Sequence, residues 1–179
     1  MALLPAAETP MTAAHGGAGD MFLSIVGTKS GPIKGESQDD KHKGEIDVLG
    51  WSWGMKTHMD VGTGQSTGRT ALKQLRVIKR LDAASCALMS AGANNEVIKK
   101  AVLTVRKAGL VQQEYFKITL EKALISSLDI QAPESSDNPL PLESVTFAFQ
   151  KIEVEYKQQG ADGQLRGSML FTHDLSEKA

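Results

Sequence analysis

Hydrophobic and polar residues alternate along most of the chain, a period-two pattern typical of β-strands with one buried face. A short apolar run at 22–26 opens this pattern, and Gly27 and the Gly31-Pro32 pair punctuate the chain after it. Strand character resumes at 75–81, after a glycine-rich loop. Further strands are predicted at 45–55, 101–106, 114–132, 143–157 and 164–173. Many strands and few helices predict a mainly β fold, either a barrel or a sandwich.

One short helix interrupts the strands. Asp82 can cap the free amides of a helix over 83–91, and Gly92 offers a left-handed stop. Its apolar positions fall at helical spacing, which predicts one face packed on a sheet or on a barrel end. They are Leu81, Ala84, Leu88 and Ala91.

The segment 143–157 changes its buried face in the middle. Val145, Phe147 and Phe149 share one parity, whereas Ile152, Val154 and Tyr156 share the other. A switch near Gln150 predicts a bulge or sharp coil through which one long strand serves two surfaces, as at barrel corners.

The strand at 45–55 contains both tryptophans. Trp51 and Trp53 point to one face and Ser52 to the other, because side chains alternate along a strand. We expect the two rings to be core or interface aromatics and Ser52 to be a small polar group on the opposite face. No nucleophile elbow and no base accompany Ser52, so catalysis is not expected.

Composition narrows the function classes. The 179 residues with 41% hydrophobic content suffice for one domain, and 20 basic against 21 acidic residues give no positive field for nucleic acid. The first twenty residues lack signal-peptide character, and no apolar stretch is long enough for membrane insertion. Cys86 is alone, which excludes an internal disulfide, and is expected to be a small buried residue on the helix.

No cofactor or metal is expected. The four histidines are widely separated, and His42, beside two aspartates, is interpreted as part of a solvated charged loop. The glycine-rich loop at 56–72 superficially resembles a phosphate-binding loop, but Arg69 stands where that motif needs lysine and no helix follows.

Several segments, in order, resemble the Hcp family, the haemolysin-coregulated tube proteins of the bacterial type VI secretion system. The resemblance covers roughly 20–175. We therefore divide the chain into a flexible arm at 1–19, an Hcp-like barrel domain at 20–175 and a tail at 176–179. The matching segments are 20–25, Lys34-Gly35-Glu36-Ser37, 42–55, 103–109, 115–120, 125–127, 143–156 and Gly160-Ala161-Asp162-Gly163.

The resemblance implies a compact antiparallel β-barrel with one short α-helix at its side. Family members form homohexameric rings that stack into a hollow tube, held in a contractile sheath and tipped by a VgrG spike. The position of Ser52 then faces the lumen, where small secreted effectors are carried. The loop at 56–72 is expected to contact a neighbouring subunit or ring; its candidate residues are Val61, Gly62, Gly64, Gly68 and Arg69.

The resemblance also implies a structural and carrier protein rather than an enzyme, made in the bacterial cytoplasm and then secreted without a signal peptide. The alternative is a monomeric β-barrel module that binds a small ligand or carbohydrate in a closed interior. A hydrolase with dispersed catalytic residues is a third possibility. Self-assembly distinguishes the first hypothesis from the other two.

Overall fold

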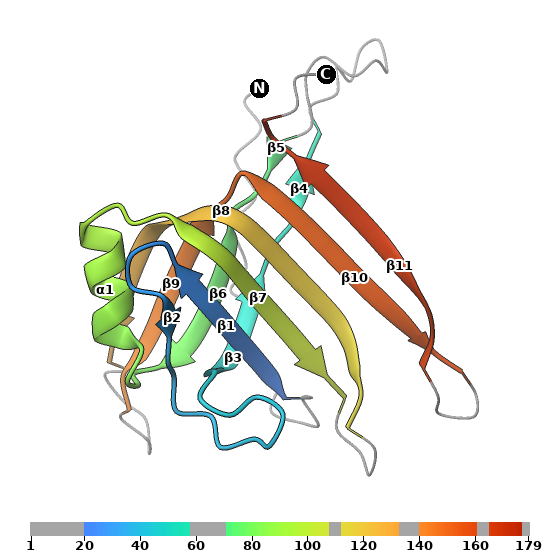
Figure 1. Ribbon diagram of the computed structural model, residues 1–179, viewed down its shortest axis with the longest axis horizontal. Helices are drawn as coiled ribbons and strands as arrows, with labels where there is room; N and C mark the ends of the chain where they lie inside the picture. The colour runs from blue at the N-terminus through green and yellow to red at the C-terminus, as the bar shows by residue number, and fades with distance from the viewer. Residues whose placement is uncertain (1–19, 58–70, 108–111, 133–139, 161–164, 177–179) are drawn as a thin grey trace, which may run out of the picture.

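The computed structural model describes residues 20–57, 71–107, 112–132, 140–160 and 165–176 of the chain. Strands dominate the described residues, and one helix lies at the side of the sheet (Figure 1). The elements are β1 (Met21–Gly27), β2 (Pro32–Ile33), β3 (Ile46–Ser52), β4 (Met55–Lys56), β5 (Ala71–Leu72), β6 (Leu75–Arg80), α1 (Ser85–Ala93), β7 (Ile98–Arg106), β8 (Glu114–Gln131), β9 (Leu142–Ala148), β10 (Lys151–Gln159) and β11 (Leu165–Asp174).

Six strands close into an antiparallel barrel. The hydrogen-bonded order is β8-β7-β1-β3-β6-β9, and β9 pairs back to β8. β10 pairs with β8 and carries β11, so these two strands extend away from the barrel (Figure 1). The prediction of a mainly β fold with an antiparallel barrel and one short helix is therefore confirmed.

β8 is long enough to belong to both the barrel and the extension. Its first half, Phe116 to Glu121, pairs with β10, and its second half, Leu124 to Gln131, pairs with β9. Lys122, between the halves, has a left-handed backbone with φ of 49°. The strand turns a corner at this residue.

The predicted single strand over 143–157 is wrong, although its change of face near Gln150 is real. β9 ends at Ala148 and β10 begins at Lys151. The backbone amide of Gln150 donates to the carbonyl of Glu121 at 3.3 Å, next to the corner in β8. The long strand that serves two surfaces is thus β8, and β9 and β10 are two separate partners of its two halves.

The barrel interior is filled with apolar side chains. Inward residues of the strands pack into one cluster, and one face of α1 covers it. The fully buried members include Leu23, Ile25, Ile46, Leu75, Val77, Ile98, Leu103, Ile118, Leu120, Val145, Phe147 and Ile152. Such a filled interior gives no support to a small ligand held in a closed central pocket.

The helix begins and ends later than predicted. It runs from Ser85 to Ala93, and Asp82 accepts the amide of Ala84 at 3.0 Å instead of capping a helix over 83–91. Gly92 lies inside the helix, and the left-handed residue after it is Asn95, with φ of 49°. An asparagine tolerates this conformation, so the glycine is not needed as a stop.

The buried face of α1 agrees only partly with the predicted pattern. Ala84, Leu88 and Ala91 are buried, whereas Leu81 is exposed because it precedes the helix and leaves its face. Cys86 is also exposed, which corrects the expectation that it is buried. It lies on α1, but it faces away from the core.

Candidate functional site

The tryptophan strand is shorter than predicted and contains an irregularity. β3 ends at Ser52, and its register with β6 shifts between Val48 and Gly50. Trp51 lies opposite Val77, a core residue, so the ring of Trp51 is on the inward face. Ser52, the next residue, is exposed on the outward face.

The two tryptophans contact different parts of the fold. Trp51 stacks on Phe116 of β8, with ring centroids 5.3 Å apart and an interplanar angle of 13°. Trp53 lies against Phe171 of β11, with centroids 6.2 Å apart and rings tilted by 47°. Both rings are half-buried against the core cluster. Trp51 packs on the barrel through Phe116, whereas Trp53 contacts the extension through Phe171.

Ser52 belongs to a polar row that crosses four strands of the barrel on its outer face. Ser52 of β3 pairs with Arg76 of β6, Arg76 pairs with Thr146 of β9, and Thr146 pairs with Ser127 of β8. Nε of Arg76 donates to Oγ of Ser144 at 2.7 Å. We call Ser52, Arg76, Thr146 and Ser127 the polar row.

The extension ends in an exposed strand. β11 pairs with β10 along one edge, and its other edge closes the strand order without a further partner among the described residues. Met169 and Leu170 are 63% and 62% exposed, and they point to opposite faces because they are adjacent in a strand. An unpaired edge with apolar side chains on both faces is a surface that favours pairing with another chain.

Two opposite charges are buried inside the barrel wall. Nζ of Lys79 lies 2.6 Å from Oε2 of Glu143, and Oγ of Ser85 donates to the same oxygen at 2.7 Å. Lys79 also contacts Asp82 at 2.8 Å. The network joins β6, β9 and the start of α1, and so fixes the helix on the barrel.

Sequence analysis did not single out this buried pair, although a signal exists. Lys79 has the inward parity of Val77, and Glu143 has the inward parity of Val145. A basic and an acidic residue at inward positions of two strands indicate a buried ion pair, because a lone charge would be costly there.

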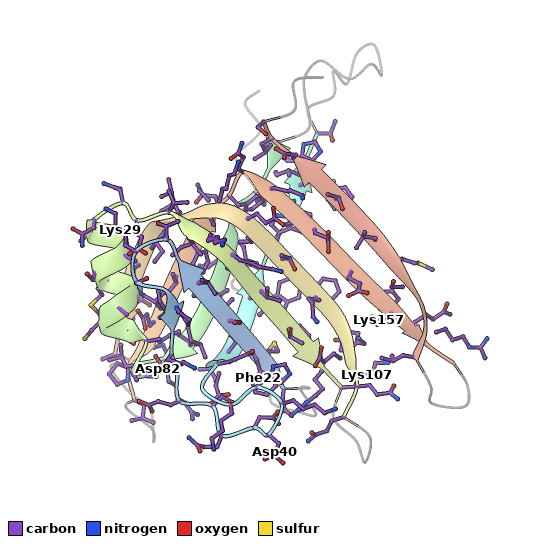
Figure 2. All side chains as sticks on the ribbon, viewed as in Figure 1. Phe22, Lys29, Asp40, Asp82, Lys107 and Lys157 are labelled. Carbon is purple, nitrogen blue, oxygen red and sulfur yellow. The ribbon has the colours of Figure 1, made fainter. Side chains whose placement is uncertain are left out.

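A second charge cluster lies at one end of the barrel, where Figure 2 labels Phe22 and Asp40. Arg106 of β7 is buried, and its Nη2 atom contacts carboxylates of Asp20 at 2.7 Å and Asp39 at 2.6 Å. The Arg106 hydrogen bond lowers the pKa of Asp39 to about 2, and hydrogen bonding to Asp39 raises the pKa of Arg106. The cluster ties the charged loop to the start of β1.

His42 is buried, which corrects its interpretation as part of a solvated loop. Its ring stacks on Phe22 with centroids 4.2 Å apart, and Nδ1 lies 2.9 Å from Glu45. Nε2 lies 3.4 Å from Glu114 of β8. The loop at 37–45 folds back on β1, a tertiary contact that charge composition alone does not reveal.

Gly35 explains how this loop approaches the barrel so closely. A Cβ atom added there would collide with the backbone of Glu45 and Ile46. The amide of Gly35 donates to the carbonyl of Gly44 at 2.9 Å, which holds the two chain segments together. Only glycine allows this contact without a backbone shift.

The loop candidates Val61, Gly62, Gly64, Gly68 and Arg69 lie outside the described residues, as does the arm at 1–19. So does most of the segment 133–141, which contains three prolines and is expected to be a loop within the domain. The segment predicted as one loop over 56–72 begins and ends in a two-stranded sheet. In it, Met55 pairs with Leu72 and Lys56 with Ala71.

Among the described residues, no group of three or more His, Cys, Asp or Glu side chains could hold a metal ion. Within the ranges that the structure describes, no helix is both long and apolar enough to cross a membrane. Ser52 pairs with Arg76 across β3 and β6.

Comparisons with known proteins agree with the resemblance. The family model described as "Type VI secretion system effector, Hcp" matches residues 22–156. Protein hcp1 of Pseudomonas aeruginosa is 39% identical over 151 residues, which is 83% of this chain and 89% of that protein. The Major exported protein of the same organism is 27% identical over 158 residues, 79% of this chain and 91% of that protein.

A solved structure titled "Structure of a type six secretion system protein" has the same fold. It superposes with a TM-score of 0.77 at 28% identity and covers 88% of this chain and 96% of its own. A sequence match over most of the barrel and a fold match over nearly the whole of a solved relative point the same way. The chain belongs to the Hcp family of type VI secretion tube proteins.

Proposed function

We propose that six copies of this chain form a ring and that the rings stack into a hollow inner tube, which sheath contraction expels behind a VgrG spike. The observation that carries the proposal is the exposed edge of β11, with Met169 and Leu170 on its two faces. The barrel itself is closed, but the extension ends in an open apolar edge, and such an edge is suited to contact with a second copy.

A head-to-tail contact supports a ring better than a symmetric dimer. The edge of β11 projects from one side of the barrel, and α1 lies at the other side in Figure 1. When a patch on one side contacts a different patch on the neighbour, rotation closes the assembly into a ring. The loop at 61–70 is proposed to contact the next ring, which a deletion of those residues tests.

Ser52 and its polar row are proposed to face the channel, where small effectors are carried. The row is exposed on a barrel face that does not include the edge of β11. A hydrophilic face is suited to a water-filled channel, whereas the apolar edge is suited to burial. In this proposal the protein is made in the bacterial cytoplasm and leaves through the type VI apparatus without a signal peptide.

The native mass of the purified chain, by light scattering after size exclusion, tests the ring. We expect six times the 19.2 kDa chain mass, with annular particles in negative stain of the same peak. A monomer would overturn the ring.

Two matched variants test whether the edge of β11 forms the ring contact. Leu170→Lys places a charge on that edge and should shift the native mass toward the monomer. Val97→Lys makes the same change at another exposed apolar residue, immediately before β7 and away from β11. If Val97→Lys lost the ring and Leu170→Lys kept it, the ring contact would not lie at the edge of β11.

A further inference from the structure

The polar row contains a single cation at its centre. Arg76 lies between Ser52 and Thr146, and the row ends at Ser127. Neighbouring strands are about 4.8 Å apart, so Ser52 and Thr146 flank Arg76 on the two strands beside it. Hydroxyl groups on both sides of one arginine form a surface of donors.

The guanidinium of Arg76 is held without being neutralised. Its Nε donates to Oγ of Ser144 at 2.7 Å, which fixes the plane of the group. No carboxylate among the described residues forms an ion pair with Arg76. Asp129 shares the face and pairs with Ser144, but it makes no ion pair with Arg76.

An arginine held at Nε presents its Nη1 and Nη2 groups as a fork. Such a fork matches the two oxygens of a carboxylate, and both hydrogen bonds are charge-assisted. Because Ser144 already orients the group, less conformational entropy is lost when a ligand binds. The flanking hydroxyls can donate to the remaining lone pairs of the carboxylate.

We infer that the polar row is a carboxylate-binding strip, and that Arg76 makes the channel selective for polypeptides with clustered Asp and Glu side chains. The inference rests on the proposed function, because it assumes that this face lines the channel. Six rows around one channel would add their fields and concentrate acidic cargo.

The test uses peptide probes and the full-length chain. Fluorescence anisotropy measures the binding of fluorescein-labelled octaglutamate with an amidated C-terminus. Arg76→Gln removes the charge, Arg76→Lys keeps the charge but removes the fork, and Arg80→Gln is the control. Arg80 is exposed on the same face of β6, next to Leu142 and outside the row.

We expect Arg76→Gln to weaken octaglutamate binding about tenfold, the usual value of one charge-assisted pair. Arg76→Lys should lose less, about threefold, since it keeps the charge but not the planar geometry. Arg80→Gln should change affinity by less than about threefold, as expected for an exposed charge outside the site. Equal losses in Arg76→Gln and Arg80→Gln would overturn the strip, because affinity would then follow net charge alone.

Two further probes define the ligand class. Octaglutamine with an unblocked C-terminus reports on a terminal carboxylate; if it binds in an Arg76-dependent way, the strip recognises carboxylates at chain ends as well. Labelled oligothymidylate reports on phosphates, and tighter binding than octaglutamate would overturn the assignment to acidic polypeptides.

The native mass of every sample separates this inference from the proposed function. A monomeric wild type that binds octaglutamate through Arg76 would overturn the ring but keep the strip. A ring that fails to bind octaglutamate would keep the proposed function and overturn the strip. If Arg76→Gln does not fold, Arg76→Lys and Arg80→Gln still decide between fork and net charge.

Discussion

Lys79 and Glu143 form an ion pair across β6 and β9, with 2.6 Å between Nζ and Oε2 and neither side chain exposed to solvent. Oε1 of Glu143 has no hydrogen-bond partner, and Oε2 also accepts from Ser85. The carboxylate therefore depends on Lys79 for most of its compensation. Removing one partner leaves a buried charge, whereas removing both does not.

Lys79→Met should lower the free energy of unfolding by about 3 kcal/mol, measured by urea denaturation at fixed protein concentration. The double variant Lys79→Met with Glu143→Met should recover at least half of that loss, since no charge is then stranded. Lys100→Met, at an exposed position of β7, is the control and should be nearly neutral. A double variant less stable than Lys79→Met would contradict the argument.

Lys122→Gly should stabilise the barrel by about 1 kcal/mol, because glycine adopts the left-handed conformation of this corner without the Cβ penalty. Asn95→Gly is the matched control, with the same φ of 49°, and should gain less since asparagine tolerates that region. Thermal unfolding of both variants measures the difference. A Lys122→Gly protein less stable than the wild type would mean that the lysine side chain outweighs the backbone strain.

The ion pair between Asp39 and Arg106 should make the free energy of unfolding depend on pH in the acidic range. Arg106 lowers the pKa of Asp39 in the folded protein from 3.8 to about 2. The pair therefore contributes fully to the free energy of unfolding above the ordinary pKa of 3.8, and this contribution is lost as the pH falls toward about 2. Asp39→Asn should therefore lower the unfolding midpoint at neutral pH. The wild-type and variant midpoints should converge near pH 2, and curves that stay parallel down to that pH would argue against the pair.

The two tryptophans should have different roles. Trp51→Ala removes a ring stacked on Phe116 in the barrel and should cost about 2 kcal/mol of unfolding free energy, less than for a fully buried ring. Trp53→Ala removes the contact with Phe171 on β11 and should loosen the extension. We therefore expect Trp53→Ala to lower the native mass with little loss of unfolding free energy. Trp51→Ala should lower the unfolding free energy with little change in native mass. Identical effects on both quantities would show that the extension and the barrel act as one unit.

Much of the fold could be predicted because one face of most strands is apolar. The parities of Val145 and Phe147, and of Ile152 and Val154, placed the change of face correctly near Gln150. They could not show that β8 is the strand that bends. The corner residue, Lys122, has no sequence signal for a left-handed backbone, and the bend becomes visible only from the pairing of β8 with two partners.

The site was less predictable because it depends on register. Alternation placed Ser52 opposite the tryptophans, but the irregularity between Val48 and Gly50 decides which residue of β6 lies beside it. Arg76 reads as an ordinary exposed strand residue until that register is known. His42 was misjudged for a similar reason, since its burial comes from a loop that returns to Phe22.

The shared strand β8 also determines how the subunit bears mechanical load. Its hydrogen bonds to β10 run across the strands, as in every antiparallel pair. A force parallel to the strands of the extension therefore strains all the hydrogen bonds between β8 and β10 at once. A force applied across the strands at one end breaks these hydrogen bonds one pair at a time. The extension should therefore resist force along its strands better than force across its free edge.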